Sequence, residues 1–291
     1  MFDTVCIVGV GLIGGSLGIA IRERKLAKKV VGVVRREETI NAAFQRKAID
    51  NGSTNLIEAA RGADLVFLAS PVGQMKALSE ELVAGVRAGA IVTDAGSTKA
   101  GVVEECTPVF GHKAHFVGGH PMAGSELTGV ENARGDLFEN AIWILTPSED
   151  TPCAAVDKLK ELIEALGATP LVMDAQTHDK LLAVTSHLPH ITAAALVHLF
   201  TGAHKEHEVT QRLIAGGWRD GTRVAAGSPE MWRDICVANS EAIGHSLDTM
   251  IEELTSLRKM IADKDSESLH QWFQCASEVR RKQGYFPRKS S

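Results

Sequence analysis

The chain has 291 residues, which is enough for one large domain or two ordinary ones. Its content of 44% hydrophobic and 23% charged residues is typical of a globular protein and excludes a disordered or fibrous chain. The formal net charge of −5 argues against nucleic acid as the main partner, because binding to phosphates requires a basic face.

The cysteines and the apolar segments indicate the compartment. The five cysteines are scattered and never form a CxxC pair, which predicts free thiols in a reducing cytoplasm. No charged-then-apolar signal segment precedes the first expected strand, which has begun by Thr4. The longest apolar stretch, residues 181–200, contains Pro189 and three histidines. We therefore expect a buried helix there rather than a membrane span.

The first element of the chain predicts a dinucleotide site. A β-branched apolar run at residues 4–8 predicts a buried strand, and it breaks at once into a GxGxxG turn before an apolar helix. Gly9 permits the tight turn, Gly11 lets a pyrophosphate approach the backbone, and Gly14 lets the helix pack on the strand. The helix N-terminus offers N–H groups and a partial positive charge to the phosphates. The candidate cofactor-binding residues here are Gly9, Gly11, Leu12, Ile13 and Gly14.

Strands and helices alternate along residues 1–173. Further strands are expected at residues 30–34, 64–69, 90–94, 116–121, 141–147 and 169–173. This alternation predicts an α/β domain with a Rossmann-type, doubly wound parallel sheet whose ligands lie at the carboxyl ends of the strands. From residue 174 to residue 291 the periodicity is helical, which predicts an all-helical second domain.

The end of the second strand bears on the choice of nucleotide. An acidic residue there binds the ribose 2′-hydroxyl of NAD, whereas an arginine accommodates the 2′-phosphate of NADP. Arg35 and Arg36 come first and Glu37 follows, so NADP is favoured over NAD, with Arg35 as the main contact. The alternative is a solvated charge cluster in which Glu37 still binds the ribose. Ser70 and Pro71, which close the strand at residues 64–69, are further cofactor-binding candidates.

Two later strand ends carry candidates for the chemistry. Ser97 lies in a turn of small residues after the strand at 90–94, although a plain helix N-cap explains it equally well. His120 lies between two glycines and a proline at the end of the strand at 116–121. A neutral imidazole there can accept a proton, and a group of this type titrates near pH ~6–7. The alternative is a structural histidine.

The helical half offers histidines and arginines. His187 and His190 are spaced i, i+3, so they share a helix face, but no third ligand completes a metal site and we expect no metal. Arg219 and Arg223 follow two glycines and a tryptophan, which suits a carboxylate clamp, since guanidinium pairs bidentately. The alternative is a pair of ordinary interdomain salt bridges. One long helix is expected at residues 231–259, and part of its apolar stripe predicts pairing with a second subunit.

Six motifs occur in the order GVGLIGGS, DAGSTK, GGHPMAGSE, SHLPH, RDGTR and MWRD. Together they resemble the prephenate/arogenate dehydrogenase family, also called cyclohexadienyl dehydrogenases, over nearly the whole chain. Members have a Rossmann domain followed by a helical dimerisation domain, and they make tyrosine precursors. The resemblance implies oxidative decarboxylation of prephenate and/or arogenate by a cytoplasmic homodimer, with NADP or NAD as hydride acceptor. It implies the minimal catalytic form, without a mutase or regulatory domain.

The resemblance also implies roles for individual residues. His120 would take the proton of the substrate hydroxyl, and Ser97 would bridge that hydroxyl, His120 and the nicotinamide. Arg223 would bind the ring carboxylate. His190, and with it His187, would contact the substrate side chain, and Arg219 would be a further substrate contact.

Two rival hypotheses remain at this stage. A β-hydroxyacid dehydrogenase or an imine reductase has the same two-domain plan but would use a lysine or aspartate on the helical domain. A non-catalytic nucleotide-sensing protein would bind the cofactor without turnover and would leave His120, His190 and Arg223 unexplained. The sequence does not separate a pyruvyl from an alanyl side chain on the substrate, and it does not indicate whether tyrosine inhibits the protein.

Overall fold

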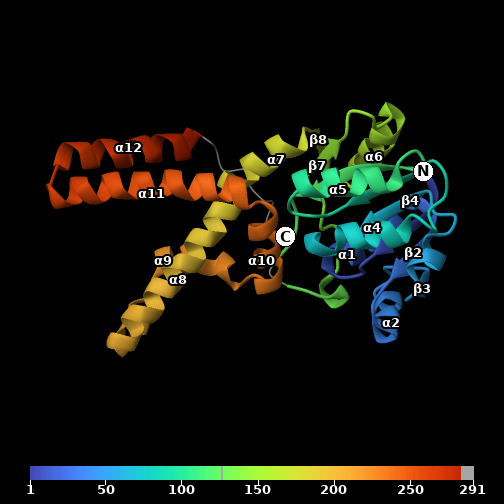
Figure 1. Cartoon of the computed structure of the whole chain (residues 1–291). Coiled ribbons are helices and arrows are strands. Elements are labelled where there is room, and N and C mark those ends of the chain that lie inside the picture. Colours follow the sequence, from blue (N-terminus) through green and yellow to red (C-terminus); the bar gives the residue numbers. More distant parts are fainter. Residues whose placement is uncertain (126, 283–291) are drawn as a thin grey trace. The chain divides into compact units, whose positions relative to one another are not determined.

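A computed structural model describes residues 1–125 and 127–282, so Glu126 of the GGHPMAGSE motif lies outside the described residues. The chain forms two compact units, Met1–Ser240 and Glu241–Ser291. Figure 1 shows the elements of both.

The first unit contains one sheet of eight strands in the order β3-β2-β1-β4-β5-β6-β7-β8. The strands are β1 Phe2–Val8, β2 Ala27–Val33, β3 Asn51–Ser53, β4 Leu65–Leu68, β5 Ala90–Asp94, β6 Ala114–Pro121, β7 Ile142–Pro147 and β8 Thr169–Val172. The order reverses between β1 and β4, which is the switch point where ligands bind in doubly wound sheets.

Helices cover both faces of this sheet and enclose two apolar cores. The helices are α1 Leu12–Glu23, α2 Glu37–Gln45, α3 Leu56–Ala60, α4 Met75–Leu82, α5 Ala100–Phe110 and α6 Cys153–Ala165, with short 3-10 turns at η1 Val72–Gln74 and η2 Val130–Asn132. One core contains side chains of α1, α2 and α6, and the other contains side chains of α3, α4 and α5. The predicted doubly wound α/β fold is thereby confirmed (Figure 1).

Two details of the sheet differ from the sequence-based expectation. The edge strand β3 was missed, because its three residues are polar or glycine and give no apolar run. The sheet is not entirely parallel, since β6 pairs with β7 in the antiparallel direction. The described residues between these two strands form no α-helix and contain the short turn η2, whereas a parallel pairing requires a crossover connection.

After β8, the described chain contains only helices and short turns. They are α7 Ala175–Leu182, the π-helix η3 Ala183–His187, α8 Leu188–Glu206, η4 Glu208–Leu213, α9 Gly216–Thr222, η5 Arg223–Ala226, α10 Pro229–Ala238, α11 Ser240–Ala262 and α12 Ser266–Lys282. The predicted all-helical second half is confirmed.

The apolar helix of this half is less buried than the sequence predicts. The continuous helix Ala175–Glu206 is long and apolar enough to cross a membrane by length and composition alone, and only 28% of its most apolar stretch is buried. Within α8 only His190 and Ala193 are buried, while Leu199 is 71% exposed. The expectation of a buried helix is therefore wrong for the described part of the chain, because most residues of α8 are partly or fully exposed.

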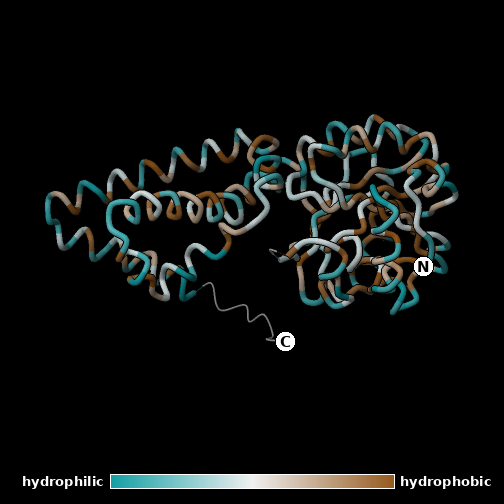
Figure 2. The backbone as a smooth tube through the Cα atoms, turned by 90° about the horizontal axis from the view of Figure 1, so that it is seen from below, coloured by the Kyte–Doolittle hydropathy of each residue, from teal (hydrophilic) through white to brown (hydrophobic). Residues whose placement is uncertain are grey.

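The single helix expected at residues 231–259 is also wrong. Asn239 has φ −117° and ψ 34°, which is outside the helical region, so α10 ends at Ala238 and α11 begins at Ser240. In the second unit, the indole N–H of Trp272 in α12 donates to Glu253 in α11 over 3.3 Å. Apolar and polar residues alternate along both helices (Figure 2), and Ile251 and Leu254 of α11 are at least half exposed.

Candidate active site

In the glycine-rich turn after β1, backbone atoms occupy the space that the side chains of other residues would need. Gly9 has φ +94°, and a Cβ atom there would lie 2.5 Å from the carbonyl oxygen of Ala69. A Cβ atom on Gly14 would lie 2.1 Å from the carbonyl oxygen of Gly9, so α1 packs directly on the turn. Gly11 is different, because a Cβ atom there would meet no atom within 4 Å. The space beside Gly11 is open to a ligand.

The N-terminus of α1 lies at this open space. Gly11 is the N-cap of α1, and no side chain of the described residues caps this end of the helix. The first turn, which contains Leu12 and Ile13, has no acidic residue. The free N–H groups and the helix dipole favour an anion at this position. The uncapped helix and the open face of Gly11 therefore fit the pyrophosphate of a dinucleotide.

The other predicted cofactor residues surround the same edge of the sheet. Ser70 Oγ lies 3.3 Å from the position of a Cβ atom on Gly9, and Pro71 is the exposed residue before η1. Arg35 and Arg36 are exposed at the end of β2, and the Arg35 guanidinium donates to the Gln74 amide oxygen over 2.5 Å. The rival ribose ligand Glu37 is also exposed, in the first turn of α2.

Asp94 at the end of β5 binds three groups of the candidate active site, on Gly96, Gly119 and Lys99. Its fully buried carboxylate accepts hydrogen bonds from the N–H groups of Gly96 (2.7 Å) and Gly119 (2.9 Å) and forms an ion pair with the buried Lys99 ammonium. A Cβ atom on Gly119 would lie 2.5 Å from the carbonyl oxygen of Asp94. The DAGSTK and GGHP motifs are therefore one packed unit, which fixes the backbone on either side of Ser97 and next to His120.

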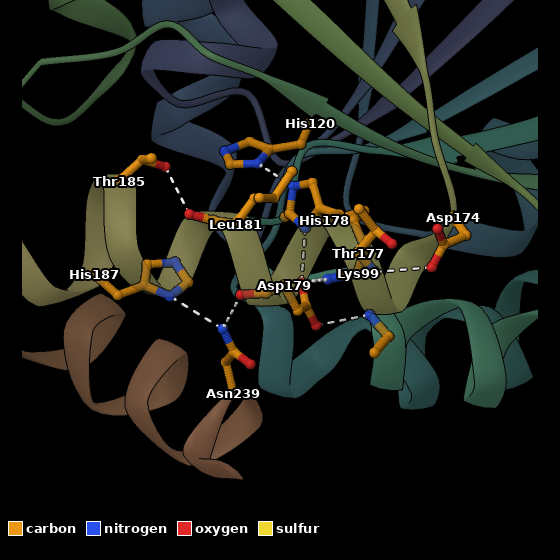
Figure 3. Close-up of polar contacts among 12 residues, drawn as sticks. Lys99, His120, Asp174, Thr177, His178, Asp179, Leu181, Thr185, His187 and Asn239 are labelled. Atoms are coloured by element: carbon orange, nitrogen blue, oxygen red, sulfur yellow. Dashed lines mark hydrogen bonds and ion pairs between the residues drawn. The ribbon is translucent and has the colours of Figure 1, made fainter. Parts of the chain in front are cut away.

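His120 is buried at the end of β6 and lies against His178 of α7. Its Nδ1 atom is 2.8 Å from the Nε2 atom of His178 (Figure 3). Burial lowers the pKa of His120 well below the usual value of 6.5, and His178, Lys99 and His187 lower it further. His120 is therefore a neutral imidazole at pH 7, as a proton acceptor must be.

Asp179 connects His178 to the helix that follows Ser97. Its Oδ1 atom lies 2.7 Å from His178 Nδ1 and accepts the N–H of Lys99 over 2.7 Å, while Oδ2 accepts the N–H of Ala100 over 2.8 Å. This carboxylate of α7 caps α5 across about 80 residues of chain (Figure 3). The N-cap of α5 is Lys99 and not the half-buried Ser97, so the structure excludes the helix N-cap alternative for Ser97.

The π-helix η3 brings His187 to the same region. His178 and His187 are nine residues apart, so a continuous α-helix would put them on opposite faces. The wider π turn changes that rotation, and such turns are frequent at functional sites. Asn239 donates from Nδ2 to the carbonyl oxygen of Asp179 (2.8 Å) and contacts His187 Nδ1 over 3.2 Å (Figure 3). Burial lowers the pKa of His187 to about 4, partly offset by Asp179.

His190 lies one turn further along the chain, on the wall of a cavity. Its ring stacks on Trp232 with centroids 3.5 Å apart, and the ring of His187 meets the same indole edge-on at 6.2 Å. Burial lowers the pKa of His190. The cavity beside this stack has a volume of about 640 Å³ and is also lined by Gly227 and Arg233. This volume suits a small organic molecule.

The two predicted clamp arginines lie on elements that contact α8. Arg219 is in α9 and Arg223 begins η5, and both side chains are exposed. Both elements pack on α8, the helix that carries His190. Neither arginine belongs to the network around His120 in Figure 3.

Family models match both the α/β half and the helical half of the chain. Residues 17–172 match the family model described as prephenate dehydrogenase, nucleotide-binding domain, and residues 174–275 match prephenate dehydrogenase, dimerization domain. The chain belongs to the prephenate dehydrogenase family. The glycine turn at residues 9–14 precedes the matched range, so its assignment depends on the geometry above.

Individual family members are similar to nearly the whole chain. Prephenate dehydrogenase of Bacillus subtilis (strain 168) is 39% identical over 281 residues, which are 96% of this chain and 76% of that protein. The crystal structure of prephenate dehydrogenase from A. aeolicus in complex with hydroxyphenyl propionate and NAD+ has a TM-score of 0.91 and 32% identity, and the match covers 98% of this chain and 99% of that one. The structure of Synechocystis arogenate dehydrogenase has a TM-score of 0.83 and 31% identity, covering 97% and 100% of the two chains.

Membership in the prephenate dehydrogenase family confirms the predicted family and the predicted class of activity. The chain is an NAD(P)-dependent oxidoreductase of tyrosine biosynthesis. The two rival hypotheses, a β-hydroxyacid dehydrogenase and a non-catalytic nucleotide sensor, are not supported by these matches. The roles of single residues and the preferred nucleotide stay predictions.

Sequence reasoning missed part of this prephenate dehydrogenase site. The missed residues are Asp94, Lys99, His178, Asp179 and Asn239. The available signal was the adjacent His-Asp pair at the start of the helical half, since a carboxylate beside a histidine is a frequent catalytic arrangement. No group of three or more potential metal ligands occurs among residues 1–125 and 127–282.

Proposed function

We propose that this protein oxidatively decarboxylates prephenate, arogenate or both, and that His120 is the general base of the reaction. The observation that carries the proposal is the buried, neutral His120 at a strand end, in contact with a His-Asp pair and beside the turn that contains Ser97. Support for the substrates comes from relatives named prephenate dehydrogenase and arogenate dehydrogenase that match nearly the whole length of the chain.

The glycine turn and the N-terminus of α1 would hold the pyrophosphate of the dinucleotide. The residues that fit this task are Gly9, Gly11, Leu12, Ile13 and Gly14, with Ser70 and Pro71 at the adjacent strand end. When bound, the nicotinamide ring supplies a hydride acceptor. The chain itself contributes orientation and the exclusion of water.

His120 and Ser97 would act on the substrate hydroxyl. His120 Nδ1 is occupied by His178, so its Nε2 atom is the one that accepts the hydroxyl proton. As the hydroxyl-bearing carbon is oxidised to a ketone, loss of carbon dioxide from the opposite carbon makes the ring aromatic. Ser97, in the turn anchored by Asp94, would donate a hydrogen bond that orients the same hydroxyl.

The helical half would bind the carboxylates and the side chain of the substrate. Arg223 is assigned to the ring carboxylate, since a guanidinium pairs with it bidentately. His190, which lines the cavity beside Trp232, is assigned to the side chain, together with His187. Arg219 of α9 is a secondary candidate for the same carboxylates.

The direct test is a four-way assay of purified protein with prephenate or arogenate, each with NAD or NADP. We expect reduced nucleotide, carbon dioxide and an aromatic product in at least one combination. Nucleotide binding without turnover in all four combinations would overturn the proposal. Reduction of the nucleotide without carbon dioxide release would assign the protein to another class of dehydrogenase.

The pH profile gives a separate test of His120. A neutral base is active above its pKa, so kcat/KM falls as the pH drops through that pKa. Burial above all, and then His178, Lys99 and His187, hold the pKa of His120 well below 6.5. The acid limb of kcat/KM should therefore lie below pH 6.5 rather than at the ~6–7 expected for an exposed histidine. An acid limb above pH 6.5 would contradict the assignment.

We propose NADP as the preferred nucleotide, with Arg35 and then Arg36 facing the 2′-phosphate. Arg35→Ala should raise the KM for NADP roughly 10- to 100-fold and leave the KM for NAD nearly unchanged, since a hydrogen bond between charged groups contributes about 1.5–3 kcal/mol. Steady-state kinetics with both nucleotides measures this difference. Arg61→Ala, an exposed arginine at the end of α3, is the matched control. Equal losses for NAD and NADP would favour the alternative in which Glu37 binds the ribose.

We propose that the protein is a cytoplasmic homodimer with domains 1–173 and 174–291. The domain boundary is supported by the end of β8 at Val172 and the start of α7 at Ala175. The dimer is supported by the match to a dimerization domain and by exposed apolar residues such as Leu199 and Ile251. The five cysteines are free thiols, as a reducing compartment requires. Light scattering coupled to gel filtration measures the dimer directly.

A further inference from the structure

A His-Asp pair lies behind His120, on the Nδ1 side of its ring. His178 and Asp179 are adjacent in α7 and are both buried. They form a chain of two short contacts, from Asp179 Oδ1 to His178 Nδ1 (2.7 Å) and from His178 Nε2 to His120 Nδ1 (2.8 Å). The chain is shown in Figure 3.

The positions of the ring hydrogens in these two contacts follow from the groups that can accept a hydrogen bond but cannot donate one. An ionised carboxylate has no proton to donate, so His178 Nδ1 carries the hydrogen that Asp179 accepts. With a single ring hydrogen, on Nδ1, His178 has a lone pair on Nε2, and the 2.8 Å contact is then a hydrogen bond that His120 Nδ1 donates. His120 is thereby left with an unprotonated Nε2 atom.

Asp179 fixes a second part of the site at the same time. Its carboxylate accepts the N–H groups of Lys99 and Ala100, which are the first groups of α5. The turn that contains Ser97 leads directly into this cap, so one carboxylate holds both the Ser97 turn and the ring behind His120. Asn239 holds the other side of Asp179 by donating to its carbonyl oxygen.

We propose that His178 and Asp179 are positioning residues that hold His120 in its Nδ1–H tautomer and leave Nε2 free to accept the substrate proton. The inference depends on the proposed role of His120 as the base. In the opposite tautomer, Nε2 would carry a hydrogen and could not take a proton from the hydroxyl. A carboxylate-histidine pair acts in this way in serine hydrolases, where it fixes the tautomer of the base.

A pair of substitutions at His178 separates this role from simple packing. His178→Gln puts an amide oxygen near the position of the Nε2 atom, so His120 Nδ1 keeps an acceptor. His178→Phe keeps a ring of similar shape but removes the acceptor. In both variants Asp179 keeps its two backbone hydrogen bonds to α5. If His178 only fills space, Phe should be tolerated better than Gln, whereas the tautomer role predicts the reverse order.

The expected result is a loss of kcat of about 100-fold or more in His178→Phe, since a positioned base contributes 10²–10⁴. His178→Gln should keep most of kcat, and the Kd for NADP should stay unchanged in both variants. The matched control is the same pair of substitutions at His115, which is half-buried on the same strand as His120. Phe retaining as much activity as Gln at position 178 would overturn the proposal.

A second measurement does not depend on turnover. Two-dimensional ¹H–¹⁵N spectra of the histidine rings, assigned with His120→Asn, show which nitrogen of His120 carries the proton. We expect Nδ1 in the wild type and in His178→Gln, and a loss of that preference in His178→Phe. A proton on Nε2 in the wild type would overturn the proposal. If instead the spectra agree and no substrate is turned over, the tautomer inference stands and the proposed function fails.

Discussion

Replacing His120 with asparagine is expected to lower kcat by about 10²–10⁴, the usual contribution of a general base. Asparagine has no ring nitrogen that can take the proton of the substrate hydroxyl. The Kd for the nucleotide should stay close to the wild-type value, because the glycine turn lies after β1 and His120 lies at the end of β6. Stopped-flow or steady-state kinetics and a binding titration on the same sample measure the two effects separately.

The control for this variant lies on the same strand. His115→Asn makes the same change five residues earlier on β6, at a half-buried position away from the Asp94–Lys99 unit. It should retain the kcat of the wild type. A near-normal kcat in His120→Asn would exclude His120 as the base, and an equal loss in both variants would indicate a general effect on β6.

Sequence reasoning predicts those parts of the site whose position follows from contiguous residues or from the order of strands and helices. The strand, glycine turn and helix at residues 4–23 are contiguous, so their order alone indicates how the backbone must fold. Ser97 and His120 were found because parallel strands place their carboxyl ends at one edge, whatever the distance along the chain. In the structure β5 and β6 are neighbouring parallel strands, so their carboxyl ends lie side by side.

The parts that were missed depend on contacts between distant segments. Asp179 caps α5 from 79 to 80 positions away, and His178 meets His120 from 58 positions away. No local pattern predicts such contacts. The π-helix η3 adds to the difficulty, because it breaks the helical period that relates His178 to His187.

Tertiary contacts also explain why two helices were misjudged. The break at Asn239 has no sequence signal, because asparagine tolerates both helix and turn, and its side chain is instead used by Asp179 and His187. The apolar sequence of α8 predicts a buried helix, but most of its residues are partly or fully exposed. Apolar periodicity predicts that a face is covered, but it does not say whether the covering element belongs to the same chain or to a second copy.

The buried ion pair of Asp94 and Lys99 leads to a prediction on the free energy of unfolding. Lys99→Met should lower the free energy of unfolding by about 3–5 kcal/mol, because removing one partner of a buried ion pair leaves an uncompensated charge. Both side chains are fully buried, and the Asp94 carboxylate would retain only the N–H groups of Gly96 and Gly119. Urea denaturation at fixed protein concentration measures the change, since the apparent stability of a dimer depends on concentration.

The loss of unfolding free energy in Lys99→Met can be compared with the loss at an exposed ion pair. Lys160→Met removes the partner of Asp157 in an exposed i, i+3 pair on α6 and should cost no more than about 1 kcal/mol. Adding Asp94→Asn to Lys99→Met should recover part of the loss, because it removes the buried charge. A loss in Lys99→Met as small as that in Lys160→Met would mean that the Asp94 carboxylate is held by its backbone hydrogen bonds alone. In that case the positions of Ser97 and His120 would depend on the two N–H groups and on the Asp179 cap, and not on the ammonium.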